Sequence, residues 1–175
     1  DFKSIYINDQ VGMALRNDGT VEAFGRFGNS KTLKKYAVID IGLDTFHCVL
    51  LKKDGSLLSL NEQNGLDYDC YNQNWLNETP KGFNYVSVST GVKFSIALTN
   101  EGKIVGWGDD TYGQISDIPT NEKFISISSR RDYCLALTED GRIFAWGGYL
   151  EVKKIDQRGQ TSAFGDNESY DTDDT

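Results

Sequence analysis

The segment VSVSTGVKFSIALTNEGKIVGWGDDTYGQ, residues 86–114, decides the fold of this chain. Its first two runs alternate large with small residues, and a Glu-Gly turn at 101–102 separates them from a third run that ends in Trp107-Gly108. Alternation with a period of two is typical of β-strands, and a glycine between two such runs is typical of a hairpin. The segment therefore predicts three consecutive strands joined by short turns.

The same pattern recurs along the chain. A glycine follows an acidic residue in four turns, at Gly19, Gly55, Gly102 and Gly141. These glycines lie roughly 36 to 47 residues apart, which is within the range of propeller blades. A leucine stands four residues before each of them, at Leu15, Leu51, Leu98 and Leu137. Small residues dominate the positions five and seven before the glycine, so each strand has a face of large side chains and a flat face.

A flat face can receive the large side chains of the next sheet, which suits sheets stacked around an axis as propeller blades are. Trp107 and Trp146 hold one register in their repeats, and Phe24 and Leu60 hold it in the other two. We expect all four to be core side chains that end the strand after each hairpin.

Two of the repeats, 86–114 and ISISSRRDYCLALTEDGRIFAWG at 125–147, closely resemble the regulator of chromosome condensation repeat. The resemblance implies an all-β chain with a β-propeller fold, usually of seven blades. Four recognisable repeats are expected in 1–150, at about 2–36, 37–82, 83–123 and 124–150. Four is fewer than the usual ring, so we expect a partial propeller. It is a fragment of a larger chain, part of a ring that another subunit completes, or an unusually small propeller.

The segment 148–163 finishes the fourth repeat or begins a closing strand. The tail 164–175 is acidic and is expected to be disordered.

Composition excludes several classes of partner. Lys and Arg number 18 against 26 Asp and Glu, a net charge of −8, which argues against nucleic acid and anionic membranes. No apolar run reaches the roughly 18 residues of a membrane span. Cysteine is sparse and no leader is recognisable, so we expect an intracellular protein, cytoplasmic or nuclear.

Enzyme chemistry is not expected. The single histidine, His47, lies beside Cys48, but adjacent strand residues face opposite sides of a sheet. Cysteine and histidine do not have zinc-ligand spacing, and glycines form neither a phosphate loop nor a dinucleotide fingerprint. No metal and no cofactor are therefore predicted.

The turns between the first two strands of each repeat are the main candidate site. In a propeller these turns gather at one end of the axis, and we call them the rim: 8–11, 44–47, 91–94 and 130–133. Arginine and aromatic side chains on one surface are typical of protein-binding sites. The candidate partner-binding residues are Gln10, Phe46, His47, Lys93, Phe94, Arg130, Arg131 and Tyr133. The alternative is that they are ordinary turn residues.

A secondary candidate is the long insertion at 61–82, with Tyr68, Tyr71 and Trp75. It could contact a peptide, a sugar or a neighbouring subunit, or it could be an extended outer strand with a polar loop. The favoured function is a non-enzymatic module whose rim binds a protein partner, as a regulatory or scaffold subunit. The resemblance leaves two alternatives: a guanine-nucleotide exchange regulator of a small GTPase, and a propeller-type inhibitor of a secreted enzyme.

Overall fold

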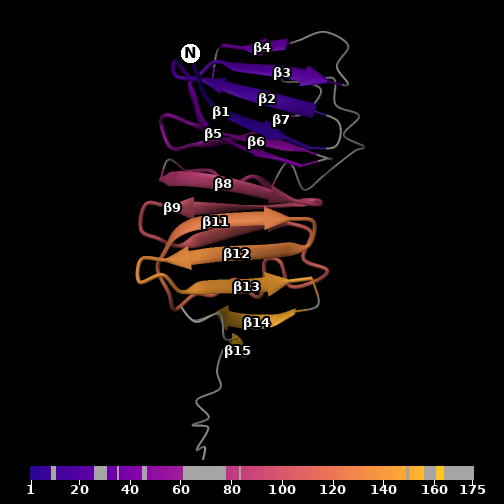
Figure 1. Ribbon diagram of the computed structural model, residues 1–175, viewed down its shortest axis with the longest axis vertical. Helices are drawn as coiled ribbons and strands as arrows, with labels where there is room; N and C mark the ends of the chain where they lie inside the picture. Colours follow the sequence, from indigo (N-terminus) through magenta and orange to yellow (C-terminus); the bar gives the residue numbers. More distant parts are fainter. Residues whose placement is uncertain are drawn as a thin grey trace, which may run out of the picture.

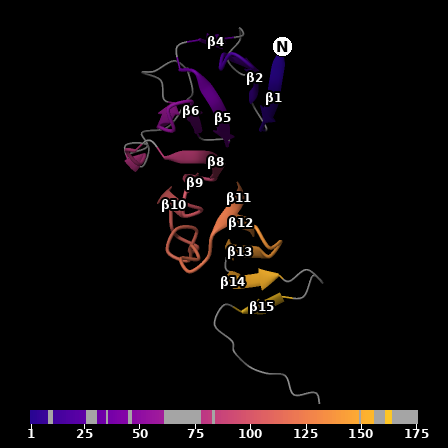
Figure 2. The ribbon, with the colours of Figure 1, turned by 90° about the vertical axis from the view of Figure 1, so that its left-hand side faces the viewer.

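Four antiparallel sheets follow one another in chain order along the long axis of the molecule (Figures 1 and 2). The computed structural model describes residues 1–8, 11–25, 31–34, 36–44, 47–60, 78–82, 84–148, 150–155 and 161–163. Five candidate site residues and the acidic tail lie outside these described residues: Gln10, Phe46, Tyr68, Tyr71, Trp75 and 164–175.

Within each sheet, strands that are consecutive in the chain are neighbours. The first sheet comprises β1 (Phe2–Ile7), β2 (Val11–Arg16), β3 (Val21–Gly25) and β4 (Lys31–Leu33). The second comprises β5 (Val38–Leu43), β6 (Cys48–Lys52) and β7 (Leu57–Leu60). The third comprises β8 (Tyr85–Gly91), β9 (Phe94–Thr99) and β10 (Ile104–Gly108). The fourth comprises β11 (Phe124–Arg130), β12 (Tyr133–Thr138), β13 (Ile143–Gly147), β14 (Leu150–Ile155) and β15 (Thr161–Ala163).

The first strand of every sheet has the same irregularity. Its register against the second strand shifts near its start, between Phe2 and Ser4 in β1 and at the equivalent place in β5, β8 and β11. One extra residue in one strand of an antiparallel pair is a β-bulge, which increases the local twist. The four sheets therefore share the same pairing of their first three strands and the same position of the bulge.

The turn glycines connect consecutive sheets. All four have a positive φ, near +80°, and the carbonyls of the first three accept a hydrogen bond from the strand that opens the next sheet. These bonds run from Val38 N to Gly19 O (3.0 Å), from Tyr85 N to Gly55 O (3.1 Å) and from Phe124 N to Gly102 O (2.9 Å). A Cβ on Gly19 would lie 2.9 Å from the backbone of Ala37 and Val38, so glycine is required there for close approach as well as for φ.

The core lies between the sheets. We call the residues eight, six and four positions before each turn glycine, with their cross-strand neighbours, the knob face of a sheet, and those seven and five before it, with theirs, the flat face. Between the first two sheets, the knob residues Val11, Met13 and Leu15 are clustered with the flat-face residues Cys48 and Leu50.

The next two junctions repeat this contact. Between the second and third sheets, Val49 and Leu51 are clustered with Ala97. Between the third and fourth sheets, the knob residues Phe94, Ile96 and Leu98 are clustered with Cys134 and Ala136. The predicted stacking of one sheet's large side chains on the flat face of the next is thus confirmed at all three junctions, although the flat-face residue Leu50 at the first junction is itself large.

Leu60, Trp107 and Trp146 are buried on flat faces, as predicted for residues in their register. Phe24 differs, because it is exposed. It lies on the flat face of the first sheet, which no described sheet precedes. The pattern predicted the register of Phe24 correctly, but its burial needs a neighbouring sheet.

The molecule is therefore an all-β, open, partial propeller. No sheet closes the row into a ring among the described residues. β14 and β15, from the segment after the fourth repeat's third strand, extend the fourth sheet at its outer edge (Figure 1). In the described part of the chain, no helix is long and apolar enough to span a membrane.

Candidate protein-binding rim

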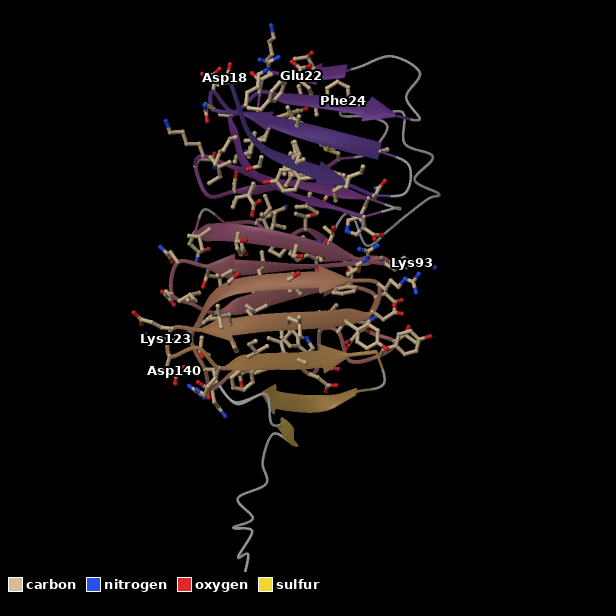
Figure 3. All side chains as sticks on the ribbon, viewed as in Figure 1. Asp18, Glu22, Phe24, Lys93, Lys123 and Asp140 are labelled. Carbon is tan, nitrogen blue, oxygen red and sulfur yellow. The ribbon has the colours of Figure 1, made fainter. Side chains whose placement is uncertain are left out.

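The rim turns lie together at one edge of the row of sheets. Figure 3 shows Lys93 at this edge, whereas Asp18 and Asp140, from the glycine turns, lie at the opposite edge. The first two rim turns are closed by a backbone bond, from Asn8 N to Val11 O and from Asp44 N to His47 O, both 3.0 Å. The Asn8 side chain also donates to the Asp44 carbonyl at 2.8 Å and so connects these two turns.

The third and fourth rim turns each hold a cation, Lys93 at the second position of its two-residue turn and Arg131 at the first position of its own. Lys93 and Arg131 both have a positive φ, 63° and 52°, which non-glycine residues rarely adopt. Val92 N donates to Arg131 O at 2.8 Å, so the two turns are adjacent. The side chains of Lys93, Arg130 and Arg131 are all exposed. Two neighbouring hairpins thus present three positive charges at one edge of an acidic molecule.

Like Lys123, these three cations have no ion-pair partner among the described residues. The Arg142 guanidinium, in contrast, bonds both carboxylate oxygens of Glu122, at 2.7 and 2.8 Å, and also Asp140. Lys103 lies 3.5 Å from Glu101. The rim cations are therefore available to a carboxylate from outside the chain.

Two predicted rim residues require a correction, because His47 and Phe94 are fully buried. The His47 Nε2 lies 2.7 Å from Ser95 Oγ of the third sheet, and Phe94 belongs to the cluster between the third and fourth sheets. Burial lowers the pKa of His47 from its ordinary value of 6.5 to about 3, so this imidazole is neutral near pH 7. Both residues stabilise junctions between sheets and cannot contact a partner from this position.

Tyr133 holds the register of Val11, His47 and Phe94, yet it is 47% exposed. The three counterparts are covered by the sheet that follows their own. No described sheet follows the fourth, so the exposure of Tyr133 reflects the open end of the row.

Sequence reasoning missed the role of Gln114. Its side chain is fully buried, its Oε1 accepts a bond from Tyr112 N at 2.8 Å, and its backbone carbonyl accepts one from Trp146 Nε1 at 2.9 Å. Gly113 precedes it with a φ of 75°. The Tyr-Gly-Gln ending of 105–114 is thus a clamp that anchors the third repeat to the tryptophan of the fourth.

A second feature that the sequence did not indicate is a carboxylate shared by three sheets. Asp40 accepts a bond from the Tyr6 hydroxyl at 2.9 Å, and its other oxygen accepts from Ser87 Oγ at 3.0 Å and Val88 N at 3.1 Å. These groups line a cavity of about 390 Å³ beside the first strands of the sheets. Burial, then the charge of Asp40, raises the pKa of Tyr6 to about 12, so the phenol stays protonated as a donor. Asp40 thus joins three neighbouring sheets, and its Oδ1 also accepts a local bond from Ile41 N at 2.9 Å.

The remaining reactive groups lie in the core. Cys48 and Cys134 are buried, and burial raises the pKa of the Cys134 thiol to about 12, which suppresses its reactivity as a thiolate. Among the described residues, no group of three or more His, Cys, Asp or Glu side chains could hold a metal ion.

The comparisons with known proteins agree with this architecture. The family model described as the regulator of chromosome condensation (RCC1) repeat matches residues 85–114, the third sheet and the Gln114 clamp. One repeat of the chain thus matches the RCC1 repeat, and the chain has the fold of a partial propeller. No curated protein matches its sequence.

Several solved propellers match its structure. Prp20p from Saccharomyces cerevisiae, whose structure was determined with its binding properties to Gsp1p and histones, has a TM-score of 0.65 at 19% identity, over 84% of this chain and 43% of that one. The same yeast protein bound to Kap60 gives a TM-score of 0.63 at 19% identity, over 90% and 47%. The CRINKLY ectodomain of the Arabidopsis thaliana receptor kinase ACR4 gives 0.62 at 17% identity, over 85% and 51%. The chain thus spans about half the length of these proteins, and at such identities the likeness concerns the fold.

Proposed function

We propose that this chain is a non-enzymatic interaction module whose rim binds an acidic segment of a protein partner. The observation that carries the proposal is the cluster of exposed cations on two adjacent hairpins, Lys93, Arg130 and Arg131. Because the chain has a net charge of −8, electrostatic repulsion disfavours binding of an acidic partner except where positive charge is concentrated. An acidic segment would gain charge-assisted hydrogen bonds there, and arginine is enriched in protein interfaces.

The test uses asparagine at the two strained turn positions. Lys93→Asn with Arg131→Asn removes both charges, and asparagine tolerates a positive φ better than most residues, so the turns are expected to keep their shape. Lys103→Asn with Lys123→Asn makes the same change in net charge at the opposite edge, where Figure 3 shows Lys123, and serves as the matched control.

Wild type and both variants are used for affinity capture from extract of the native source, and the captured partner is then titrated in purified form at low and high salt. We expect the control to keep the partner, the rim variant to lose at least tenfold in affinity, and wild-type binding to weaken with salt. Equal affinity of the two variants would contradict the proposal.

The exchange activity implied by the resemblance is a second outcome of the same experiment. The Prp20p structure was reported with binding to Gsp1p, but none of the described residues assigns that activity to this chain. If the captured partner is a small GTPase, its rate of nucleotide release with and without the chain decides between a passive module and an exchange regulator.

A further inference from the structure

The first sheet leaves open a flat face that every later sheet buries. Ile5 is 83% exposed, whereas Ile41, Val88 and Ile127, which hold the same register opposite the residue five before the turn glycine, are buried. Phe2, Ile7 and Phe24 are exposed as well. The counterparts of Phe2 are Val38, Tyr85 and Phe124, all buried. Four large apolar side chains therefore lie in contact with water at this end.

The fourth sheet leaves open a face of the opposite kind. Leu135 is 45% exposed, whereas Met13, Val49 and Ile96, the residues six before the other turn glycines, are almost completely buried. Tyr133 and Ile143 are exposed on the same knob face. Most of the exposed large apolar side chains of the described residues thus lie on two faces, one at each end of the row.

These two faces are complementary, because all three internal junctions place the knob face of one sheet on the flat face of the next. The backbone hydrogen-bonding groups of the two open faces are complementary as well. At each junction the turn glycine's carbonyl accepts a bond from the N–H of the next sheet's first large apolar residue. The open fourth sheet offers Gly141 O for this bond, and the open first sheet offers Phe2 N.

We propose that two copies of this chain associate head to tail, with the knob face of each fourth sheet covering the flat face of the other copy's first sheet. A second copy supplies both missing surfaces at once, and two such contacts close a ring of eight sheets with two-fold symmetry. Closure removes both open ends, which is how all-β folds avoid exposed faces and edges. In this ring Tyr133 becomes an interior residue, as Phe94 is.

The open flat face carries the ion pair of Glu22 and Arg16, which weakens the new junction relative to the internal ones. Glu22 stands where the later sheets have Leu58, Val105 and Phe144. It is paired with Arg16 at 3.2 Å and with the Thr32 hydroxyl, so it enters the junction with its hydrogen-bonding partners in place. The pair of copies is therefore expected to be reversible rather than permanent.

The test is sedimentation velocity of the 175-residue chain over a wide concentration range, with three single variants. Ile5→Asp places a charge on the flat face and Leu135→Asp on the knob face. Val86→Asp is the matched control, because Val86 is 49% exposed on the third sheet and lies on neither open face. Circular dichroism spectra confirm that each variant is folded. We expect wild type and Val86→Asp to sediment as dimers, and each of the other two variants to dissociate at least tenfold more readily.

Mixing the two dissociated variants tests the head-to-tail arrangement. The Ile5→Asp copy keeps an intact knob face and the Leu135→Asp copy keeps an intact flat face, so the mixture is expected to form a one-to-one pair with a single good junction. A contact between like faces would give no such recovery. Monomeric wild type at all concentrations, growth beyond two copies, or a dimer unaffected by either variant would overturn the proposal.

The inference does not rest on the function of the rim. The variant Lys93→Asn with Arg131→Asn is expected to remain dimeric while it loses its acidic partner. Loss of dimerisation in Leu135→Asp with partner binding retained would show the two properties to be separate.

Discussion

At the scale of single residues, His47 shows that the register of a residue in its repeat does not by itself predict its exposure. Its position eight before a turn glycine placed it in the rim, and that register is correct. The structure buries it, because the following sheet lies against this position and provides Ser95 as its partner. The contact between His47 and Ser95 could not be predicted from the sequence, because the two residues come from different repeats. Lys93 and Arg131 were also predicted to lie in the rim, and their side chains are exposed, because each lies in a local turn.

The buried His47 predicts a specific acid lability. Its pKa of about 3 in the folded chain lies below the ordinary 6.5 of the unfolded chain, so below pH 6.5 only the unfolded chain takes up its proton. The free energy of unfolding should therefore fall by up to about 1.4 kcal/mol per pH unit as the pH drops from 6.5 towards 3.

Because this is the only histidine of the chain, the variant His47→Gln isolates its contribution. Urea unfolding of both proteins between pH 6.5 and 5.0, above the range in which carboxylates titrate, measures the two slopes. We expect the variant to be less stable at pH 7 but nearly independent of pH in this interval. Parallel slopes would show that the imidazole is not buried as neutral.

At the scale of the elements, the sequence predicted most of what local physics determines. Strand periodicity, the turn glycines and the division into knob and flat faces all depend on neighbours within one hairpin, and all were confirmed. The shared bulge of the first strands was not predicted, because it inserts a residue without changing the composition of the strand. The buried Gln114 was visible as a motif, but its bond to Trp146 joins two repeats.

One pair of equivalent residues tests whether burial follows the stacking of sheets. Ile96 and Leu135 occupy the same register, but Ile96 lies in a closed junction and Leu135 on the open knob face. Ile96→Ala should lower the free energy of unfolding by roughly 2–5 kcal/mol, through lost burial and the cavity left behind.

For Leu135→Ala, measured at concentrations where the chain is monomeric, we expect a change within about 0.5 kcal/mol. Denaturant unfolding of both variants checks the comparison. If both variants lower the free energy of unfolding by a similar amount in dilute solution, the fourth sheet is covered by the chain itself.

At the scale of the whole molecule, the sequence predicted an incomplete propeller from the number of repeats. It did not show which faces the incompleteness leaves open, since Ile5 and Ile41 look alike in their strands although one is exposed and the other buried. What distinguishes the two ends from ordinary surfaces is that their apolar residues hold registers buried elsewhere. At the rim, in contrast, Lys93, Arg130 and Arg131 are exposed in the third and fourth repeats, and the candidate residues Gln10 and Phe46 remain predictions.

If two copies close a ring, the charge on the open flat face limits their affinity and can be removed by design. Arg16→Thr with Glu22→Leu replaces the ion pair by uncharged residues that later sheets have in the same positions. At the first position the third and fourth sheets have Thr99 and Thr138, where the second sheet has Lys52. At the second position the second sheet has Leu58. Replacing a buried ion pair by apolar groups is often stabilising by about 1–4 kcal/mol, so the dissociation constant of the pair should fall by about tenfold or more.

The matched control is Lys103→Thr with Glu101→Leu, which removes an exposed ion pair from a turn of the third sheet and should leave association unchanged. Sedimentation equilibrium of the two variants and wild type gives the three constants. Tighter pairing in the first variant alone would place the first sheet's flat face inside the dimer. A weaker or unchanged constant would mean that this face meets water, or another protein, rather than a second copy.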